Sequence, residues 1–84
     1  MSDIKIKIYS TEFCGYCKLA KQFFDENNVK YEEIDVSNDE AQQKEMISKS
    51  GQMGVPVIII EKDGKEEILV GFQKDKLSEL LNIK

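Results

Sequence analysis

The chain has no histidine and no tryptophan, and its 84 residues include one proline and two cysteines. A cluster of basic residues is also missing: the formal net charge is −4, and the lysines are interleaved with Glu and Asp. A nucleic-acid-binding domain of this size would carry a Lys/Arg stripe to neutralise phosphates. The charge pattern is typical of a solvated surface and argues against nucleic acid as a partner.

Long hydrophobic runs are missing too. The longest apolar run, Val55 to Ile60, contains Pro56 and is far too short to cross a bilayer, so we expect no membrane contact. Residues 1–7 have no apolar core and no small-residue cleavage site, so we expect no signal peptide and a cytoplasmic location. Thiols are kept reduced there, which argues against a structural disulfide. Without repeats or linkers, the chain is expected to form a single domain over residues 1–84 and to be a monomer.

Hydrophobic periodicity predicts the order of the elements. Ile4, Ile6 and Ile8 alternate with polar residues, as in a strand. From Tyr16 to Asn28 the apolar spacing becomes three and four, as in a helix with one buried face. That face is expected to comprise Tyr16, Leu19, Ala20, Phe23 and Phe24. The segment from Val29 to Val36 reads as a second strand, and Glu32 and Glu33 within it favour an edge position.

The second half predicts a helix, a hairpin and a last helix. Ser37 and Glu40 have the spacing of a capping box, so a helix should follow them and end at Gly51. Val55 to Ile60 reads as a strand buried on both faces, and Asp63-Gly64 predicts a tight hairpin turn into a fourth strand. A final helix should run from Gln73 to the end, with Leu77, Leu80 and Leu81 facing inward.

The predicted order βαβαββα places the chain in the α/β class. Two βα units followed by a ββ hairpin and a helix give a mixed four-stranded sheet flanked by three helices. In such a sheet the first strand is central, which would turn Lys5 and Lys7 onto a packed face. We expect the short, polar second helix to cover that face only in part.

Cys14-Gly15-Tyr16-Cys17 is the motif that carries chemistry. It lies where a strand ends and a helix begins, so Cys14 is expected at the helix N-terminus, where free backbone N–H groups and the helix dipole favour an anion. The thiolate is the reactive form of cysteine. Cys17, one helical turn further and less exposed, could attack a mixed disulfide on Cys14. Cys14 is therefore the candidate nucleophile and Cys17 the candidate resolving thiol of a disulfide reductase.

The pair has three other interpretations. Half of a zinc site would need further Cys or His ligands, which this chain lacks, so no metal site is expected within one chain. Both cysteines could instead be small buried hydrophobes. The third alternative is an iron–sulfur cluster shared between two chains, with Cys14 as a ligand.

With its Cys14-Gly15-Tyr16-Cys17 motif, the chain resembles the glutaredoxin family, which has a thioredoxin-like fold. The similarity runs from Tyr9-Ser10 through the Cys14–Cys17 motif and Gly54-Val55-Pro56-Val57 to Gly71-Phe72. It implies that Pro56 is preceded by a cis peptide bond and lies beside the nucleophile, and that the Val55 backbone pairs with substrate. X-Pro bonds are cis in only about 5–6% of cases, so the position relative to the motif carries this expectation.

Two positions depart from the pattern of glutathione-binding members. They have a lysine where this chain has Thr11, and a Gly-Gly-x-Asp-Asp segment where it reads Val70-Gly71-Phe72-Gln73-Lys74-Asp75. The latter is similar to the Ser-Gly-Phe-Arg-Pro-Asp segment of small redoxins that serve ribonucleotide reductase and are reduced by thioredoxin reductase. Tyr16 instead matches glutaredoxins, so glutathione and a thioredoxin-reductase-like flavoenzyme both stay open as reductants.

The resemblance therefore implies a thiol–disulfide oxidoreductase in electron transport and cell redox homeostasis. Its partners would be disulfide-containing proteins and one of the two reductants, and no cofactor would be required. Gly15, where dithiol members more often have proline, is associated in the family with cluster-bridged dimers and keeps the iron–sulfur alternative open. The candidate substrate-binding residues are Thr11, Tyr16, Val55, Pro56, Gly71, Phe72 and Gln73. Phe72 has a second interpretation, packing against the last helix.

Overall fold

The Ile/Lys alternation at the start of the chain forms a seven-residue strand, as its period of two predicts. The structure, a computed structural model, describes residues 4–12, 14–52, 54–62 and 64–81. Within these residues the elements are β1 (Ile4–Ser10), α1 (Gly15–Glu26), β2 (Glu32–Asp35), α2 (Glu40–Ser50), β3 (Val57–Lys62), β4 (Lys65–Val70) and α3 (Lys74–Leu80). The predicted βαβαββα order is confirmed.

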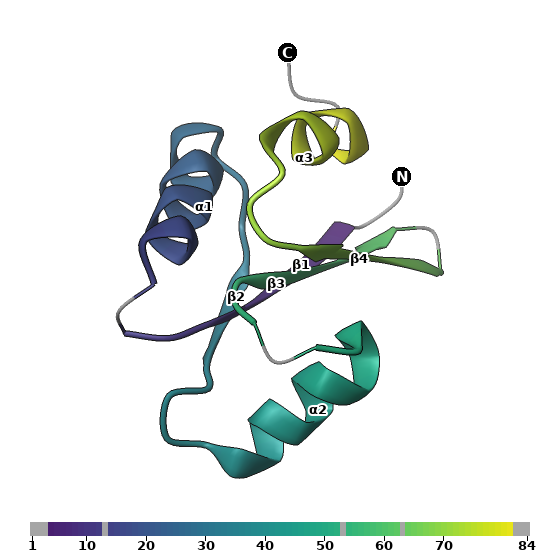
Figure 1. Cartoon of the computed structure of the whole chain (residues 1–84). Helices are drawn as coiled ribbons and strands as arrows, with labels where there is room; N and C mark the ends of the chain where they lie inside the picture. The colour runs from purple at the N-terminus through teal and green to yellow at the C-terminus, as the bar shows by residue number, and fades with distance from the viewer. Residues whose placement is uncertain (1–3, 13, 53, 63, 82–84) are drawn as a thin grey trace.

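The strands of the described residues form one four-stranded sheet in the order β2-β1-β3-β4. β1 is parallel to β2 and antiparallel to β3, and β3 is antiparallel to β4. The sheet is therefore mixed, with β2 at an edge as predicted. Figure 1 shows α1 and α3 on one face of the sheet and α2 on the other.

The two faces bury separate hydrophobic clusters. The cluster under α1 and α3 consists of Ile6, Ile8, Ala20, Phe23, Phe24, Ile58, Ile60, Leu69 and Leu77. The cluster under α2 consists of Tyr9, Val36, Met46, Val57 and Ile59. Because successive residues of β3 serve opposite clusters, all four from Val57 to Ile60 are buried, which confirms a strand buried on both faces.

The α2 face is covered only in part. Lys5 is exposed and Lys7 half-buried, and both line a hollow of about 280 Å³ beside Lys49 of α2. Tyr9, further along the same face of β1, is fully buried. The central strand thus carries its lysines on a part of this face that α2 covers incompletely, as expected.

The predicted buried face of α1 was wrong at two residues. Tyr16 is 66% exposed and Leu19 47% exposed, whereas Cys17, Ala20, Phe23 and Phe24 are buried. Residues 16, 20 and 23 and residues 17, 20 and 24 both follow a helical spacing of three and four, so periodicity alone could not choose between them. The cysteine, not the tyrosine, takes the inward position in the first turn.

The predicted capping box before α2 was also wrong. Asp39 is the N-cap, and its carboxylate accepts a hydrogen bond from the Gln42 N–H at 3.1 Å. The Ser37 hydroxyl instead accepts from the Glu12 N–H at 3.1 Å. Aspartate is as good an N-cap as serine, which leaves Ser37 free to join two loops.

Turn and boundary residues account for the other limits of the elements. Asn27 is the C-cap of α1 and Gly51 that of α2, and Gly51 has the left-handed φ of 78° that glycine favours. The pairing of Lys62 with Lys65 fits the predicted tight hairpin, where Gly64 has φ 78° and Asp63 lies outside the described residues. The strands predicted from Val29 and Val55 begin later, at Glu32 and Val57. Pro56, which has no N–H to donate to a ladder, precedes β3.

Candidate active site

The loop after β1 places Cys14 at the N-terminus of α1. Cys14 is the N-cap residue, with extended backbone angles, and its Sγ accepts a hydrogen bond from the Cys17 N–H at 3.1 Å. An N-cap side chain takes up one of the helix's unpaired N–H groups, and the dipole at this end favours negative charge. Cys14 is therefore partly open to solvent at a helix end whose dipole favours negative charge.

Cys17 has the opposite surroundings, since its side chain is fully buried. Burial raises the pKa of the Cys17 thiol to about 12, and the hydrogen bond with Cys14 adds to this, whereas a backbone hydrogen bond with Thr11 and the charge of Lys21 oppose it. The resting thiol is protonated. The predicted order of exposure, Cys14 outside and Cys17 inside, is confirmed.

Two of the candidate substrate-binding residues line one hollow. The Val55–Pro56 peptide bond is cis, as the family resemblance implied. Val55 and Thr11 face a hollow of about 220 Å³ between the segment before the motif and α2. Its other lining residues are Val36, Ser37, Gln43, Met46 and Ile47.

Three further candidates, Gly71, Phe72 and Gln73, lie between β4 and α3. Gly71 has φ 81°, and its N–H donates to the Pro56 carbonyl at 2.8 Å, which ties this segment to the residues before β3. Phe72 packs edge-on against Phe23 of α1 with ring centroids 5.9 Å apart, and it lies against the hydrophobic cluster that also contains Leu77 of the last helix. The Gln73 amide donates to the Val70 carbonyl at 2.9 Å.

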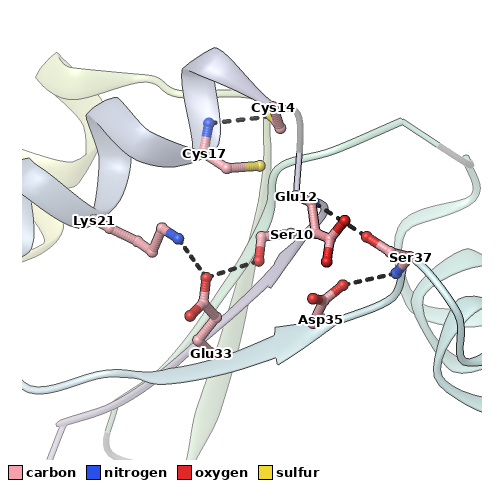
Figure 2. A network of polar contacts seen from close by, with 8 residues as sticks. All are labelled: Ser10, Glu12, Cys14, Cys17, Lys21, Glu33, Asp35 and Ser37. Atoms are coloured by element: carbon pink, nitrogen blue, oxygen red, sulfur yellow. Dashed lines mark hydrogen bonds and ion pairs between the residues drawn. The ribbon is translucent and has the colours of Figure 1, made fainter.

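A polar network that was not predicted from the sequence lies beneath the motif. Figure 2 shows Lys21 of α1 and Ser10 of β1 both directed at the Glu33 carboxylate of β2. The hydrogen bond from Lys21 is the largest cause that lowers the pKa of Glu33 below its usual value, and the hydrogen bond from the Ser10 hydroxyl adds to it. Burial acts in the opposite direction. Glu33 lies on the α1 face because it pairs with Ile8, and this register is not readable from sequence spacing. Of the three residues, only Lys21 could have been linked to the motif from the sequence, because it follows Cys17 by four positions and so lies on the same side of the helix.

Across residues 4–12, 14–52, 54–62 and 64–81, no three His, Cys, Asp or Glu side chains come together as a metal site. In the same part of the chain, no helix has the length and apolar character needed to cross a membrane.

Comparisons with known proteins agree with this geometry. The family model described as Glutaredoxin matches residues 6–65. An uncharacterized glutaredoxin-like 8.6 kDa protein in the rubredoxin operon of Clostridium pasteurianum is 42% identical over 76 residues, 90% of this chain and 96% of that protein. Among solved structures, a mutant of the thioredoxin-like protein BC3987 has a TM-score of 0.83 at 39% identity, over 95% of this chain and 97% of the other. Glutaredoxin 1 from Francisella tularensis, complexed with cacodylate, has a TM-score of 0.67 at 34% identity, over 95% and 99%. The thioredoxin-like fold is confirmed.

Proposed function

The chain belongs to the glutaredoxin family, and on that premise we propose that it is a protein disulfide reductase that cycles Cys14 and Cys17 between dithiol and disulfide. One observation carries the proposal: Cys14 is accessible at a helix N-terminus, while Cys17, whose N–H it accepts, is fully buried. Two equally exposed thiols would have no reason to take different roles. An exposed thiol beside a buried one suits a nucleophile and a resolving thiol.

The reaction has two exchanges. The Cys14 thiolate attacks one sulfur of a substrate disulfide, forms a mixed disulfide and releases the other sulfur as a thiolate, which takes up a proton. Cys17 then loses its proton and attacks Cys14 Sγ, which forms the Cys14–Cys17 bond and releases the second substrate thiol. The substrate gains two electrons and the protein becomes oxidised.

Substrate recognition is assigned to the surface around Cys14. On one side lie Thr11 and Val55, which share the hollow before α2. Tyr16 is exposed in the motif itself, next to the nucleophile's helix end. We assign to the backbone of Val55 the pairing with an extended substrate, and to Tyr16 the apolar contact. Gly71, Phe72 and Gln73 complete the surface on the β4–α3 side, and the fully buried Pro56 supports it by accepting the hydrogen bond from the Gly71 N–H.

The proposed reductant is a thioredoxin-reductase-like flavoenzyme, with glutathione a poor donor. Thr11 is neutral where a cation would meet the glutathione carboxylate, and the Gln73 amide is engaged by the Val70 carbonyl. A hydrogen bond to a charged group is worth about 1.5–3 kcal/mol, so two such losses would weaken binding by about a hundredfold or more.

An NADPH-coupled assay tests this proposal, with a disulfide-bonded protein as substrate and either a thioredoxin-reductase-type flavoenzyme or glutathione with its reductase as the electron source. We expect faster turnover with the flavoenzyme. Efficient turnover at millimolar glutathione would refute the choice of reductant. A reduced protein that cannot reduce any disulfide substrate, even with dithiothreitol as donor, would refute the reductase itself.

The alternative function is an iron–sulfur carrier or sensor. The chain fits this group poorly on its own, because Cys17 is fully buried and Cys14 is left as a single accessible thiolate. The other ligands would have to come from a second copy and from glutathione. Visible absorption after anaerobic purification would favour the cluster.

A further inference from the structure

The buried position of Cys17 creates a requirement in the resolving step of the proposed function, on which this inference rests. Only a thiolate attacks the mixed disulfide, yet the Cys17 side chain is fully buried, and burial penalises the charged form. A positive charge close to Cys17 would lower that penalty. Lys21 is four residues further along α1 and therefore lies on the same side of the helix.

The groups around Cys17 come from three elements. On α1 these are Cys14 and Lys21, and the segment after β1 adds the backbone of Thr11. From β2, Glu33 reaches Lys21. Of these groups, Lys21 is the cation that acts on Cys17.

Lys21 is held in place by partners outside its helix. Its ammonium group donates to the Glu33 carboxylate, which also accepts from the Ser10 hydroxyl at 3.0 Å. Ser10 is only 2% exposed, so the β1 end of the network is fixed in the interior. Figure 2 shows the Lys21 side chain running beneath Cys17 toward Glu33.

The charges of the network persist around neutral pH. The hydrogen bond with Glu33 raises the pKa of Lys21, while Lys21 lowers the pKa of Glu33. Tyr31 also raises the pKa of Lys21 and Asp35 opposes the lowering of the pKa of Glu33, each with a smaller effect than the hydrogen bond between Lys21 and Glu33. The pair therefore works as a fixed dipole with its positive end on α1, not as a proton acceptor.

We propose that Lys21 is a positioning residue for the resolving step: held by Glu33 and Ser10, it stabilises the thiolate of Cys17 as that thiolate attacks Cys14. In this step the Cys17 proton passes to solvent, the Cys17–Cys14 bond forms and the bond from Cys14 to the substrate sulfur breaks. The departing thiolate takes up a proton. Lys21 exchanges no proton, and it has no role in the first attack by Cys14.

The test separates the two exchanges in one kinetic trace. Reduced protein is mixed with one equivalent of dithiobis-nitrobenzoate, an aromatic disulfide whose two halves are released as coloured thiolates. The first release reports the attack by Cys14, and the second reports the attack by Cys17. Lys21→Gln removes the charge, Lys21→Arg restores it, and Lys18→Gln is the matched control, an exposed lysine on the same helix.

We expect Lys21→Gln to slow the second release by about three- to tenfold, which corresponds to a shift of half to one unit in the pH dependence of thiolate formation. Lys21→Arg should recover most of the rate. The first release should be unchanged in all variants, and this also shows that each variant is folded. The pH at which the second release accelerates should be higher in Lys21→Gln than in the parent protein.

Two results would overturn the assignment. One is a second release in Lys21→Gln that matches the parent protein at every pH. The other is an equal slowing in Lys18→Gln, which would indicate a general effect of surface charge. If the parent protein gave no first release, the proposed function itself would fail and this inference with it.

Discussion

At the residue scale, Cys14 and Cys17 differ in surroundings more than their separation of three positions suggests. Cys14 is the N-cap and partly exposed, whereas Cys17 lies inside the first turn with no exposed surface. The helix therefore does two things with one motif. It supports an anion at its end and keeps a second thiol protonated one turn further in.

The first prediction concerns the reactivity of Cys17. In a Cys14→Ser variant we expect iodoacetamide to modify Cys17 far more slowly than it modifies a free cysteine near pH 8, because burial, the largest cause of the raised pKa of Cys17, remains and leaves little thiolate there. The rate should rise as the pH is increased. Mass spectrometry over a pH series measures it.

Urea-unfolded Cys14→Ser protein is the control, and it should react as a free cysteine does. Rapid modification of native Cys17 near neutral pH would contradict the burial described here.

Residue chemistry was partly readable from the sequence. The exposure of Cys14 and the burial of Cys17 were predicted from a C-x-x-C at a strand–helix junction, where the first cysteine precedes the helix and the second lies one turn inside it. The Ser10–Glu33–Lys21 network could not be predicted, because the Ser10–Glu33 contact joins residues 23 positions apart through the register of a parallel pair. Nothing in the spacing indicates that register.

At the element scale, the helix ends depend on which of several capping residues is used. The run Ser37-Asn38-Asp39 contains three residues that are all good N-caps, so the sequence could not select one. The contact between Ser37 and Glu12 decides the choice, and it is a tertiary contact. Gly51 was predictable because it is the glycine at the end of a helical stretch, where left-handed φ is needed.

The second prediction tests the N-cap of α2. Asp39→Ala should lower the free energy of unfolding by about 1 kcal/mol, since the Gln42 N–H loses its acceptor. Asn38→Ala, at the exposed residue just before it, is the matched control and should cost much less. Urea denaturation followed by far-ultraviolet circular dichroism measures both. Asp39 would be excluded as the cap if its replacement were as harmless as that of Asn38.

At the scale of the whole molecule, the sheet separates two cores of unequal size. The larger lies under α1 and α3 and contains the aromatic pair Phe23 and Phe24, with ring centroids 6.1 Å apart. The C-x-x-C motif lies at the start of α1, which that core anchors. The order of the elements was predictable because each has its own periodicity, whereas the side of α1 that faces the core was not.

The third prediction compares a buried and an exposed side chain of α1. Phe24→Ala should lower the free energy of unfolding by about 3–5 kcal/mol, because the ring is fully buried. A chain of this length has a total stability of only about 4–13 kcal/mol, so this variant should be close to unfolding. Leu19→Ala, on the 47% exposed side of the same helix, should cost far less. Comparable losses in the two variants, measured by urea denaturation, would mean that Leu19 is buried after all.

The fourth prediction concerns the reductase cycle itself, and one measurement tests it most directly: mass spectrometry of the Cys14→Ser and Cys17→Ser variants after reaction with a disulfide-bonded protein. The Cys17→Ser variant retains the accessible nucleophile but cannot resolve the adduct, so it should accumulate a mixed disulfide on Cys14. The Cys14→Ser variant should form none, because its remaining thiol is fully buried and protonated. An adduct on Cys17 in Cys14→Ser, with none in Cys17→Ser, would reverse the two roles and contradict the account.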